Sequence, residues 1–200
     1  MIVWDVDTQV DFMLPDGKLY VPGAEQTAPA MKRLVEAVRA KGLVHVASAD
    51  DHELTDDEIS DDPDFARTYP PHCLRGTRGA RKIPETEQKD PVPITLTAMP
   101  ERYLEGREFL LLKKSFDVFT NPNTDRLLER LDPDEIVLFG VATDVCADAA
   151  IRGFLERGRR VQFVEDAARG LDESRVAACT AAWRGAGVEF TTVDEVIAAF

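Results

Sequence analysis

Several short apolar runs of this 200-residue chain are followed by side chains that could do chemistry. These side chains are Asp7, Asp50, His52, Lys113 and Cys146. A carboxylate can act as a general base, an ammonium group can stabilise negative charge, and a thiol can act as a nucleophile. An acid next to an imidazole can also bind a cation. If the fold brings these runs together, the sequence supplies a nucleophile, a base and a cation site at one place.

Cys146 is the sharpest candidate for a nucleophile. It follows a glycine-containing turn and lies in the first turn of a helix predicted over 144–157, where Thr143 or Asp144 can cap. A helix N-terminus favours the thiolate, and its free N–H groups can hold an oxyanion. Position alone leaves open a second interpretation, in which Cys146 is a small buried hydrophobic residue.

Asp7 and Lys113 are the predicted partners of this thiol. Asp7 would accept the thiol proton, and the Lys113 ammonium would favour the anion. A non-catalytic interpretation is open for each of these residues. Asp7 can be a turn residue at a strand end, and Lys113 and Lys114 can be a solvated pair of lysines.

A cation site is the second chemical hypothesis. Asp50 and His52 are two residues apart, which suits two ligands from one extended segment, and His72 lies further along the chain. Carboxylate with imidazole suits Zn²⁺, Mn²⁺ or Fe²⁺. Nine of the 15 residues at 50–64 are acidic, so a solvated loop is the alternative. His45 is expected in the core.

Alternating strands and helices must position these groups. Apolar runs predict strands at 2–6, 43–47, 109–112, 135–139, 161–164 and 188–192, and amphipathic stretches predict helices at 26–41, 123–131, 144–157, 173–184 and 194–200. This alternation predicts an α/β fold with three αβα layers around a central, mainly parallel sheet. In such sheets the chemistry collects at the carboxyl ends of the strands.

One region departs from the alternation. Residues 50–99 hold six of the 12 prolines and the acidic stretch, and they are long for a plain connection. We therefore expect one domain over 1–200 with a loop-rich insertion at about 50–99 that binds metal and substrate.

Composition narrows the class of protein further. The chain has 37 acidic and 24 basic residues and a net charge of −13, which disfavours nucleic acid and anionic membrane as partners. Its three cysteines are an odd number without a C-x-x-C pattern, which favours a reducing compartment. The opening residues contain no basic region followed by an apolar run, so we expect a cytoplasmic protein.

Three motifs carry a family resemblance. They are D-T-Q-V-D-F at 7–12, K-K-S-F-D-V-F at 113–119 and G-V-A-T-D-V-C at 140–146. Over nearly its whole length the chain resembles the isochorismatase-like cysteine hydrolases, and within them the nicotinamidase branch. The resemblance implies that Asp7, Lys113 (with Lys114 as the fallback) and Cys146 are catalytic. It also implies an oxyanion hole from the backbone N–H groups of Ala142 and Cys146, with a cis peptide before Ala142.

The nicotinamidase branch also has a metal site. S-A-D-D-H and T-Y-P-P-H-C stand where the branch has D-x-H and W-P-x-H-C. The resemblance therefore implies Asp50, His52 and His72 as ligands, with Glu58 as a fourth. The cofactor is then one divalent ion, with zinc the first choice and manganese or iron the alternatives.

The implied reaction is hydrolysis of a small carboxamide through a cysteine thioester, with nicotinamide as the first choice and a place in NAD metabolism. Phe12, Tyr69 and Val141 would contact the substrate. Tyr69 replaces the usual tryptophan and Asp51 replaces an aromatic residue, so another amidase or hydrolase of the same family is the alternative. The family also implies a homodimer or homotetramer.

A different class of enzyme fits the first strand alone. I-V-W-D-V-D-T matches the opening of haloacid-dehalogenase-like phosphatases, with Asp5 as nucleophile, Asp7 as acid and Asp50–Asp51 as a later acidic pair. This hypothesis leaves the thiol and the amine unexplained. An aspartate inside a strand must otherwise pair with a neighbour or lie on an exposed strand.

Overall fold

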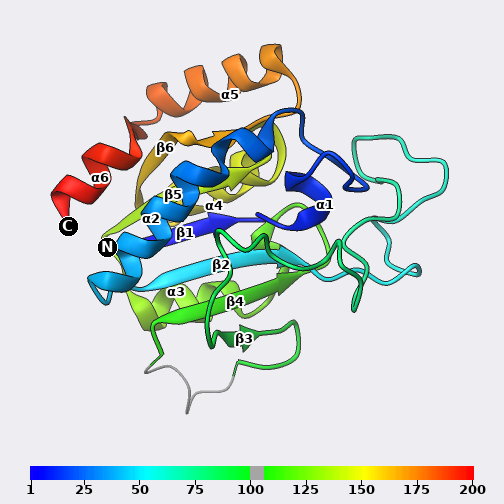
Figure 1. Ribbon diagram of the computed structural model, residues 1–200, viewed down its shortest axis with the longest axis horizontal. Helices are drawn as coiled ribbons and strands as arrows, with labels where there is room; N and C mark the ends of the chain where they lie inside the picture. The colour runs from blue at the N-terminus through cyan, green and yellow to red at the C-terminus, as the bar shows by residue number, and fades with distance from the viewer. Residues whose placement is uncertain (100–105) are drawn as a thin grey trace.

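A computed structural model describes residues 1–99 and 106–200 of the chain, and a parallel sheet forms its centre (Figure 1). Within these residues the sheet has seven strands in the order β3-β4-β2-β1-β5-β6-β7, and every neighbouring pair is parallel. The strands are β1 (Ile2–Val6), β2 (His45–Asp50), β3 (Val92–Ile94), β4 (Glu108–Lys113), β5 (Glu135–Val141), β6 (Arg160–Arg169) and β7 (Glu189–Thr191).

Helices cover both faces of this sheet. They are α1 (Val10–Met13), α2 (Ala28–Ala40), α3 (Thr124–Leu131), α4 (Asp148–Glu156), α5 (Glu173–Gly185) and α6 (Val193–Ala199), with short helical turns η1 (Ala24–Thr27), η3 (Val118–Thr120) and η4 (Thr143–Ala147). One apolar core holds side chains of α2 and α6, and the other holds side chains of α3, α4 and α5. The predicted three-layer αβα architecture is confirmed.

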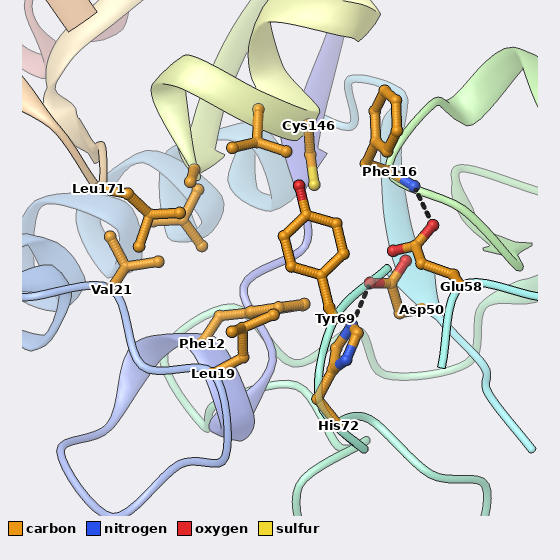
Figure 2. Close-up of a pocket in the computed structure, with 13 residues that line it drawn as sticks. Phe12, Leu19, Val21, Asp50, Glu58, Tyr69, His72, Phe116, Cys146 and Leu171 are labelled. Atoms are coloured by element: carbon orange, nitrogen blue, oxygen red, sulfur yellow. Dashed lines mark hydrogen bonds and ion pairs between the residues drawn. The ribbon is translucent and has the colours of Figure 1, made fainter. Parts of the chain in front are cut away.

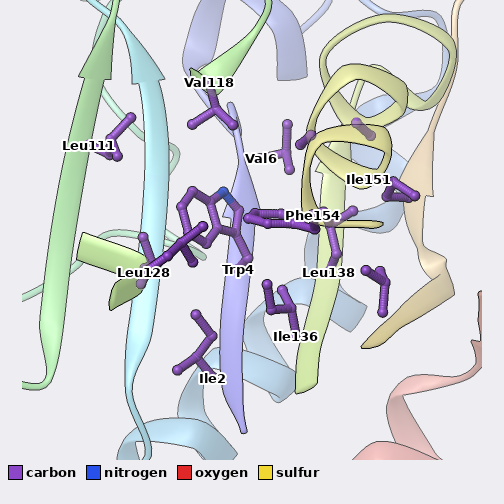
Figure 3. Close-up of a cluster of buried hydrophobic side chains, with 14 of the residues drawn as sticks. Ile2, Trp4, Val6, Leu111, Val118, Leu128, Ile136, Leu138, Ile151 and Phe154 are labelled. Atoms are coloured by element: carbon purple, nitrogen blue, oxygen red, sulfur yellow. The ribbon is translucent and has the colours of Figure 1, made fainter. Parts of the chain in front are cut away.

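The central strand β1 is buried along its whole length, as expected for a parallel strand covered on both faces. Its alternate residues face the two cores. Trp4 packs edge-on against Phe154 of α4, with ring centroids 4.8 Å apart (Figure 3). Val3 belongs to the core that contains α2. On α2, Met31, Leu34, Val35 and Val38 recur at helical spacing and are buried.

Some predicted bounds are displaced. The second strand runs over His45–Asp50 rather than 43–47, because it pairs with β4 as far as Asp50 and Lys113. Its polar end, which resembles a loop in sequence, is therefore inside the sheet. The short edge strand β3 lies within the stretch expected to be loop-rich, and Pro93 at its middle removes the usual strand signal.

The stretch between β2 and β3 contains isolated bridges and turns instead of regular helices or strands. Bridges join Gln9 to Lys82, His52 to Leu74 and Ile59 to Tyr69. The first two bridges tie this stretch to the residues that follow β1 and β2, and the third lies within it. In the described part of the chain, none of the helices is long and apolar enough to cross a membrane.

Candidate active site

The carboxyl ends of three adjacent strands bring an amine between two carboxylates. Lys113 ends β4, Asp50 ends β2 and Asp7 follows β1. The Lys113 Nζ lies 2.9 Å from Asp7 Oδ2 and also donates a hydrogen bond to Asp50 Oδ1. All three side chains are buried. The buried ammonium group therefore offsets the negative charge of two carboxylates that are themselves removed from water.

The backbone at Asp7 turns sharply out of the strand. Its φ is +49°, in the left-handed region that non-glycine residues seldom adopt. The Ser48 hydroxyl donates to Asp7 Oδ1 over 2.7 Å, so the second carboxylate oxygen is the one that meets Lys113. Ser48 was not predicted as a site residue. It alternates with Asp50 on β2, and this polar spacing was the signal that could have found it.

Charge and burial set the protonation of this group. Burial opposes the charged form of Lys113, but the Asp50 and Asp7 carboxylates hold its pKa well above the ordinary value. Burial raises the pKa of Asp7, and the nearby Lys113 charge reduces this rise without cancelling it. For Asp50, Lys113 and the two histidines outweigh burial and hold the pKa well below its usual range. The lysine is thus charged, and Asp7 is the carboxylate closer to accepting a proton.

Cys146 lies in η4, one turn after β5, and is 7% exposed. Burial raises the pKa of its thiol well above the ordinary value; Lys113 opposes this rise, and the Asp7 charge and hydrogen bond add to it. The expectation of a lowered thiol pKa at a helix N-terminus is wrong, because burial outweighs the helix and Lys113. The resting group is a thiol that can give its proton to Asp7.

The predicted capping of this helix is also wrong. Residues 143–147 form a π-helical turn before α4, and the residue before it, Ala142, makes no side-chain cap. Asp144 instead accepts hydrogen bonds from the backbone N–H groups of Leu171 (2.8 Å) and Asp172 (3.2 Å), and its carboxylate lies 3.0 Å from Arg175 Nη2. Asp144 therefore joins the Cys146 turn to the start of α5. The peptide between Val141 and Ala142 is cis, as the resemblance implied.

The four implied metal ligands form one cluster. One ligand atom from each of Asp50, His52, Glu58 and His72 lies within 4.8 Å of the others, and all four residues are buried. Asp50 Oδ2 is 3.4 Å from His72 Nε2 and 3.7 Å from His52 Nε2.

The donor set of this cluster fits a divalent ion. His72 Nδ1 donates to the Pro70 carbonyl over 2.8 Å, and His52 Nδ1 lies 3.3 Å from an Asp56 carboxylate oxygen, which can only accept. With the Nδ1 atoms engaged in this way, the Nε2 atoms face the cluster, and the buried His52 Nε2 has no hydrogen-bond partner among the described residues. Two imidazoles with two carboxylates are ligands that zinc and related ions accept.

A pocket joins the thiol and the cluster (Figure 2). Its apolar wall contains the three predicted contacts Phe12, Tyr69 and Val141, and also Leu19, Val21, Phe116, Val145 and Leu171, which were not predicted. Its polar end contains Asp50, Glu58 and His72, and Cys146 lies across from them; Ala142 also lines the pocket. The pocket is small and mainly apolar, with charged groups gathered at one end, as in sites that bind small molecules.

Gln9 is a further buried residue that sequence reasoning did not single out. Its side-chain amide donates to the Asp50 and Ala80 carbonyls, each over 2.8 Å, and accepts from the Asp50 N–H over 2.7 Å. It therefore fixes the backbone at Asp50. Its place inside the D-T-Q-V-D-F motif was the available signal.

Two alternatives are resolved by geometry. Lys114, the fallback amine, binds Asp56 Oδ2 at 2.8 Å, whereas Lys113 contacts Asp7. Asp5 is fully buried with its Oδ2 2.8 Å from Lys82 Nζ, so it pairs with a neighbour and has no access to a substrate. The phosphatase hypothesis, which needs Asp5 as nucleophile, is wrong. His45 is in the core, as expected.

A parallel sheet that is covered by helices on both faces and carries reactive side chains at the carboxyl ends of its strands defines this chain as an α/β domain with a site in the usual place. The isochorismatase domain family matches residues 2–195, and the chain belongs to that family.

Among known relatives, the nicotinamidase/pyrazinamidase of Mycobacterium tuberculosis is 28% identical over 187 residues, covering 92% of this chain and 94% of that protein. The nicotinamidase of Escherichia coli is 26% identical over 183 residues, covering 84% and 82%. The fold is similar to that of the zinc complex of pyrazinamidase from Pyrococcus horikoshii, with a TM-score of 0.75 and 21% identity over 96% of this chain and 98% of that one.

Proposed function

We propose that this chain hydrolyses a small carboxamide, with nicotinamide as the first choice, to the carboxylate and ammonia. The observation that carries the proposal is the buried Asp7–Lys113 pair beside the Cys146 thiol, at one end of a small apolar pocket. Membership of the isochorismatase family and the nicotinamidase relatives support amide hydrolysis.

Cys146 is the proposed nucleophile. Asp7 takes the proton from its Sγ, and the resulting thiolate forms a bond to the carboxamide carbon. The backbone N–H groups of Ala142 and Cys146 hold the oxygen of the tetrahedral adduct. The carbon–nitrogen bond then breaks, and the leaving nitrogen takes the proton from Asp7 to depart as ammonia.

Water completes the cycle. Asp7 takes a proton from a water molecule, whose oxygen attacks the thioester carbon. The carbon–sulfur bond breaks, Cys146 recovers the proton from Asp7, and the product leaves as the carboxylic acid, which loses its remaining proton to solvent to give the carboxylate. Lys113 stays charged throughout and stabilises the Asp7 carboxylate and the thiolate in turn.

Asp50, His52, Glu58 and His72 would hold one divalent ion, with zinc the first choice and manganese or iron the alternatives. When bound, the ion supplies a Lewis acid for a heteroaromatic nitrogen and so orients the substrate. Phe12, Tyr69 and Val141 would pack on the ring. The loop-rich stretch at about 50–99, which holds all four ligands, is the proposed metal- and substrate-binding insertion of a single domain.

The proposal extends to the setting of the enzyme. We infer a reduced, cytoplasmic location, a small amide as the partner molecule, and neither nucleic acid nor membrane as a partner. A homodimer or homotetramer is proposed from the resemblance, and light scattering on the eluting protein checks it.

Ammonia release across a panel of amides tests the function. The panel holds nicotinamide, pyrazinamide, benzamide and an aliphatic amide, with the Cys146→Ala and Cys179→Ala proteins beside the wild type. We expect turnover of the heteroaromatic amides, a loss of about 10³-fold or more in Cys146→Ala, and nearly full activity in Cys179→Ala, whose thiol lies on α5. Substantial activity in Cys146→Ala would refute the nucleophile. Turnover of benzamide but not nicotinamide would favour the alternative, another amidase of the family.

A further inference from the structure

Asp56 has one carboxylate oxygen that serves three donors. Its Oδ2 lies 3.3 Å from His52 Nδ1, accepts from the Glu53 N–H over 2.8 Å, and accepts from Lys114 Nζ over 2.8 Å. The side chain is 18% exposed, so these bonds are partly shielded from water. Neither Asp56 nor Lys114 is among the residues that line the pocket beside Cys146. The proposed chemistry therefore gives neither residue a role.

The bond to His52 decides which ring nitrogen carries the proton. A carboxylate oxygen can only accept, so Nδ1 donates and the neutral ring presents a lone pair at Nε2. That Nε2 lies 3.7 Å from Asp50 Oδ2 and 4.0 Å from Glu58 Oε1. It is buried without a hydrogen-bond partner among the described residues. The ring is thus held with its free lone pair toward the other ligands.

The two histidines of the cluster are supported differently. His72 Nδ1 donates to a neutral acceptor, the Pro70 carbonyl, at 2.8 Å. His52 Nδ1 donates to a charged one, which raises the electron density of the ring and its strength as a ligand. Of the two imidazoles, His52 is therefore the one whose ligand strength depends on a side chain that mutation can change.

Lys114 holds this carboxylate in place. Successive side chains at the end of β4 point to opposite sides, so Lys113 enters the Asp7–Asp50 pair and Lys114 reaches Asp56. The Lys114 side chain is 24% exposed and lies far enough out to anchor Asp56 without entering the cluster.

We propose that Asp56, anchored by Lys114, is a positioning residue that fixes His52 in its Nδ1–H form and thereby sets the affinity of the Asp50–His52–Glu58–His72 cluster for a divalent ion. This inference rests on the metal part of the proposed function.

Zinc binding to the metal-free full-length protein, measured by competition with a coloured chelator, tests the inference. We expect Asp56→Ala to weaken zinc binding by about 10- to 100-fold, because both the hydrogen bond and the charge are lost. Asp56→Asn keeps an acceptor oxygen and should lose less. Asp57→Asn is the matched control: this neighbour is exposed, shows no side-chain partner in the described part of the chain, and should stay within about 2-fold of wild type.

A second measurement separates positioning from loss of structure. The ¹⁵N spectrum of the imidazoles in the metal-free protein should show His52 as the Nδ1–H form in wild type and Asp57→Asn, and as a mixture of forms in Asp56→Ala. Thermal unfolding of each metal-free variant identifies any that fails to fold. The double variant Asp56→Ala/Lys114→Met should bind zinc as weakly as Asp56→Ala alone, because Lys114 acts through Asp56.

Three results would overturn the inference: equal zinc affinity in folded Asp56→Ala and Asp57→Asn, an unchanged His52 tautomer in Asp56→Ala, or a further loss in the double variant. These differ from failure of the proposed function itself. Wild-type protein that binds no zinc, manganese or iron would remove the metal site and the inference together, and absence of amide turnover with intact metal binding would remove the chemistry alone.

Discussion

The Lys113 ammonium lies 2.9 Å from the Asp7 carboxylate although the strands that carry the two residues are not neighbours. Strand β2 lies between β4 and β1, and it ends at Asp50, which pairs in register with Lys113. The long lysine side chain therefore reaches across one strand and contacts both carboxylates. Lys113 therefore balances the charge of both the Asp7 and the Asp50 carboxylates.

Replacement of Lys113 by methionine tests this balance. Lys113→Met leaves two buried carboxylates without their shared cation, and it should lower the free energy of unfolding by roughly 3–5 kcal/mol and abolish turnover. Urea unfolding in the presence of a chelator measures the loss. Lys114→Met removes the same charge from a partly exposed pair and should cost about 1 kcal/mol or less. Equal losses in the two variants would contradict the central role of Lys113.

Tyr69 carries a hydroxyl that points toward Cys146 (Figure 2). Burial, with the nearby Cys146 and Glu58, raises the pKa of Tyr69 to about 12, so the hydroxyl is a hydrogen-bond donor at neutral pH. Tyr69→Phe keeps the ring against the pocket and removes only this donor. We expect kcat/KM for nicotinamide to fall about 10-fold with zinc content unchanged. A role in packing alone predicts wild-type kinetics for Tyr69→Phe and a loss only in Tyr69→Ala.

Asp144 connects the turn that carries Cys146 to Leu171, which lines the pocket. Asp144→Ala removes the acceptor of the partly buried Leu171 N–H and of the exposed Asp172 N–H, and it should lower the free energy of unfolding by about 1 kcal/mol. Because Leu171 loses its anchor, KM should rise more than kcat falls. Steady-state kinetics and urea unfolding of Asp144→Ala and Asp144→Asn check this, since the asparagine keeps an acceptor oxygen. Identical behaviour of both variants to wild type would show that the connection is dispensable.

Glu108 provides a prediction of pH dependence away from the site. Burial works against its charged form, but the Lys89 N–H and the Arg39 guanidinium hold its pKa below the ordinary 4.5. A carboxyl whose pKa is lowered on folding stabilises the fold above its unfolded value, and this contribution is lost as the pH falls through its folded value. Glu108→Gln should therefore cost about 1 kcal/mol at pH 7, with the difference from wild type shrinking as the pH falls below 4.5.

Urea unfolding of Glu108→Gln and wild type at neutral and acidic pH measures this difference. Glu129→Gln on the exposed surface of α3 is the control and should match wild type at every pH. A gap for Glu108→Gln that stays constant toward low pH would mean that packing, rather than charge, accounts for the loss.

The sequence predicted the elements whose apolar pattern is local. The buried run of β1 and the spacing of Met31, Leu34, Val35 and Val38 on α2 identify their structures without reference to the rest of the chain. The carboxyl-end rule then placed Asp7, Asp50 and Lys113 at one edge, and their contacts agree with it.

Features that depend on distant partners were not predictable in this way. Asp5 pairs with Lys82, 77 positions along the chain, so the sequence around Asp5 could not distinguish a buried ion pair from a nucleophile. The π-helical turn at 143–147 has the same residue pattern as an ordinary helix start. Burial decided the thiol pKa of Cys146, and burial is known only once the fold is known.

The three hydrogen bonds of Gln9 have a consequence for how the protein begins to unfold. One side-chain amide fastens the end of β2 to the turn at Ala80, two stretches that are remote along the chain. Any fluctuation that lifts the turn at Ala80 from the sheet must also loosen the strand end that carries Asp50. On gentle warming, an ion bound at Asp50 and the proposed activity should therefore be lost in one concerted step, before the rest of the domain melts.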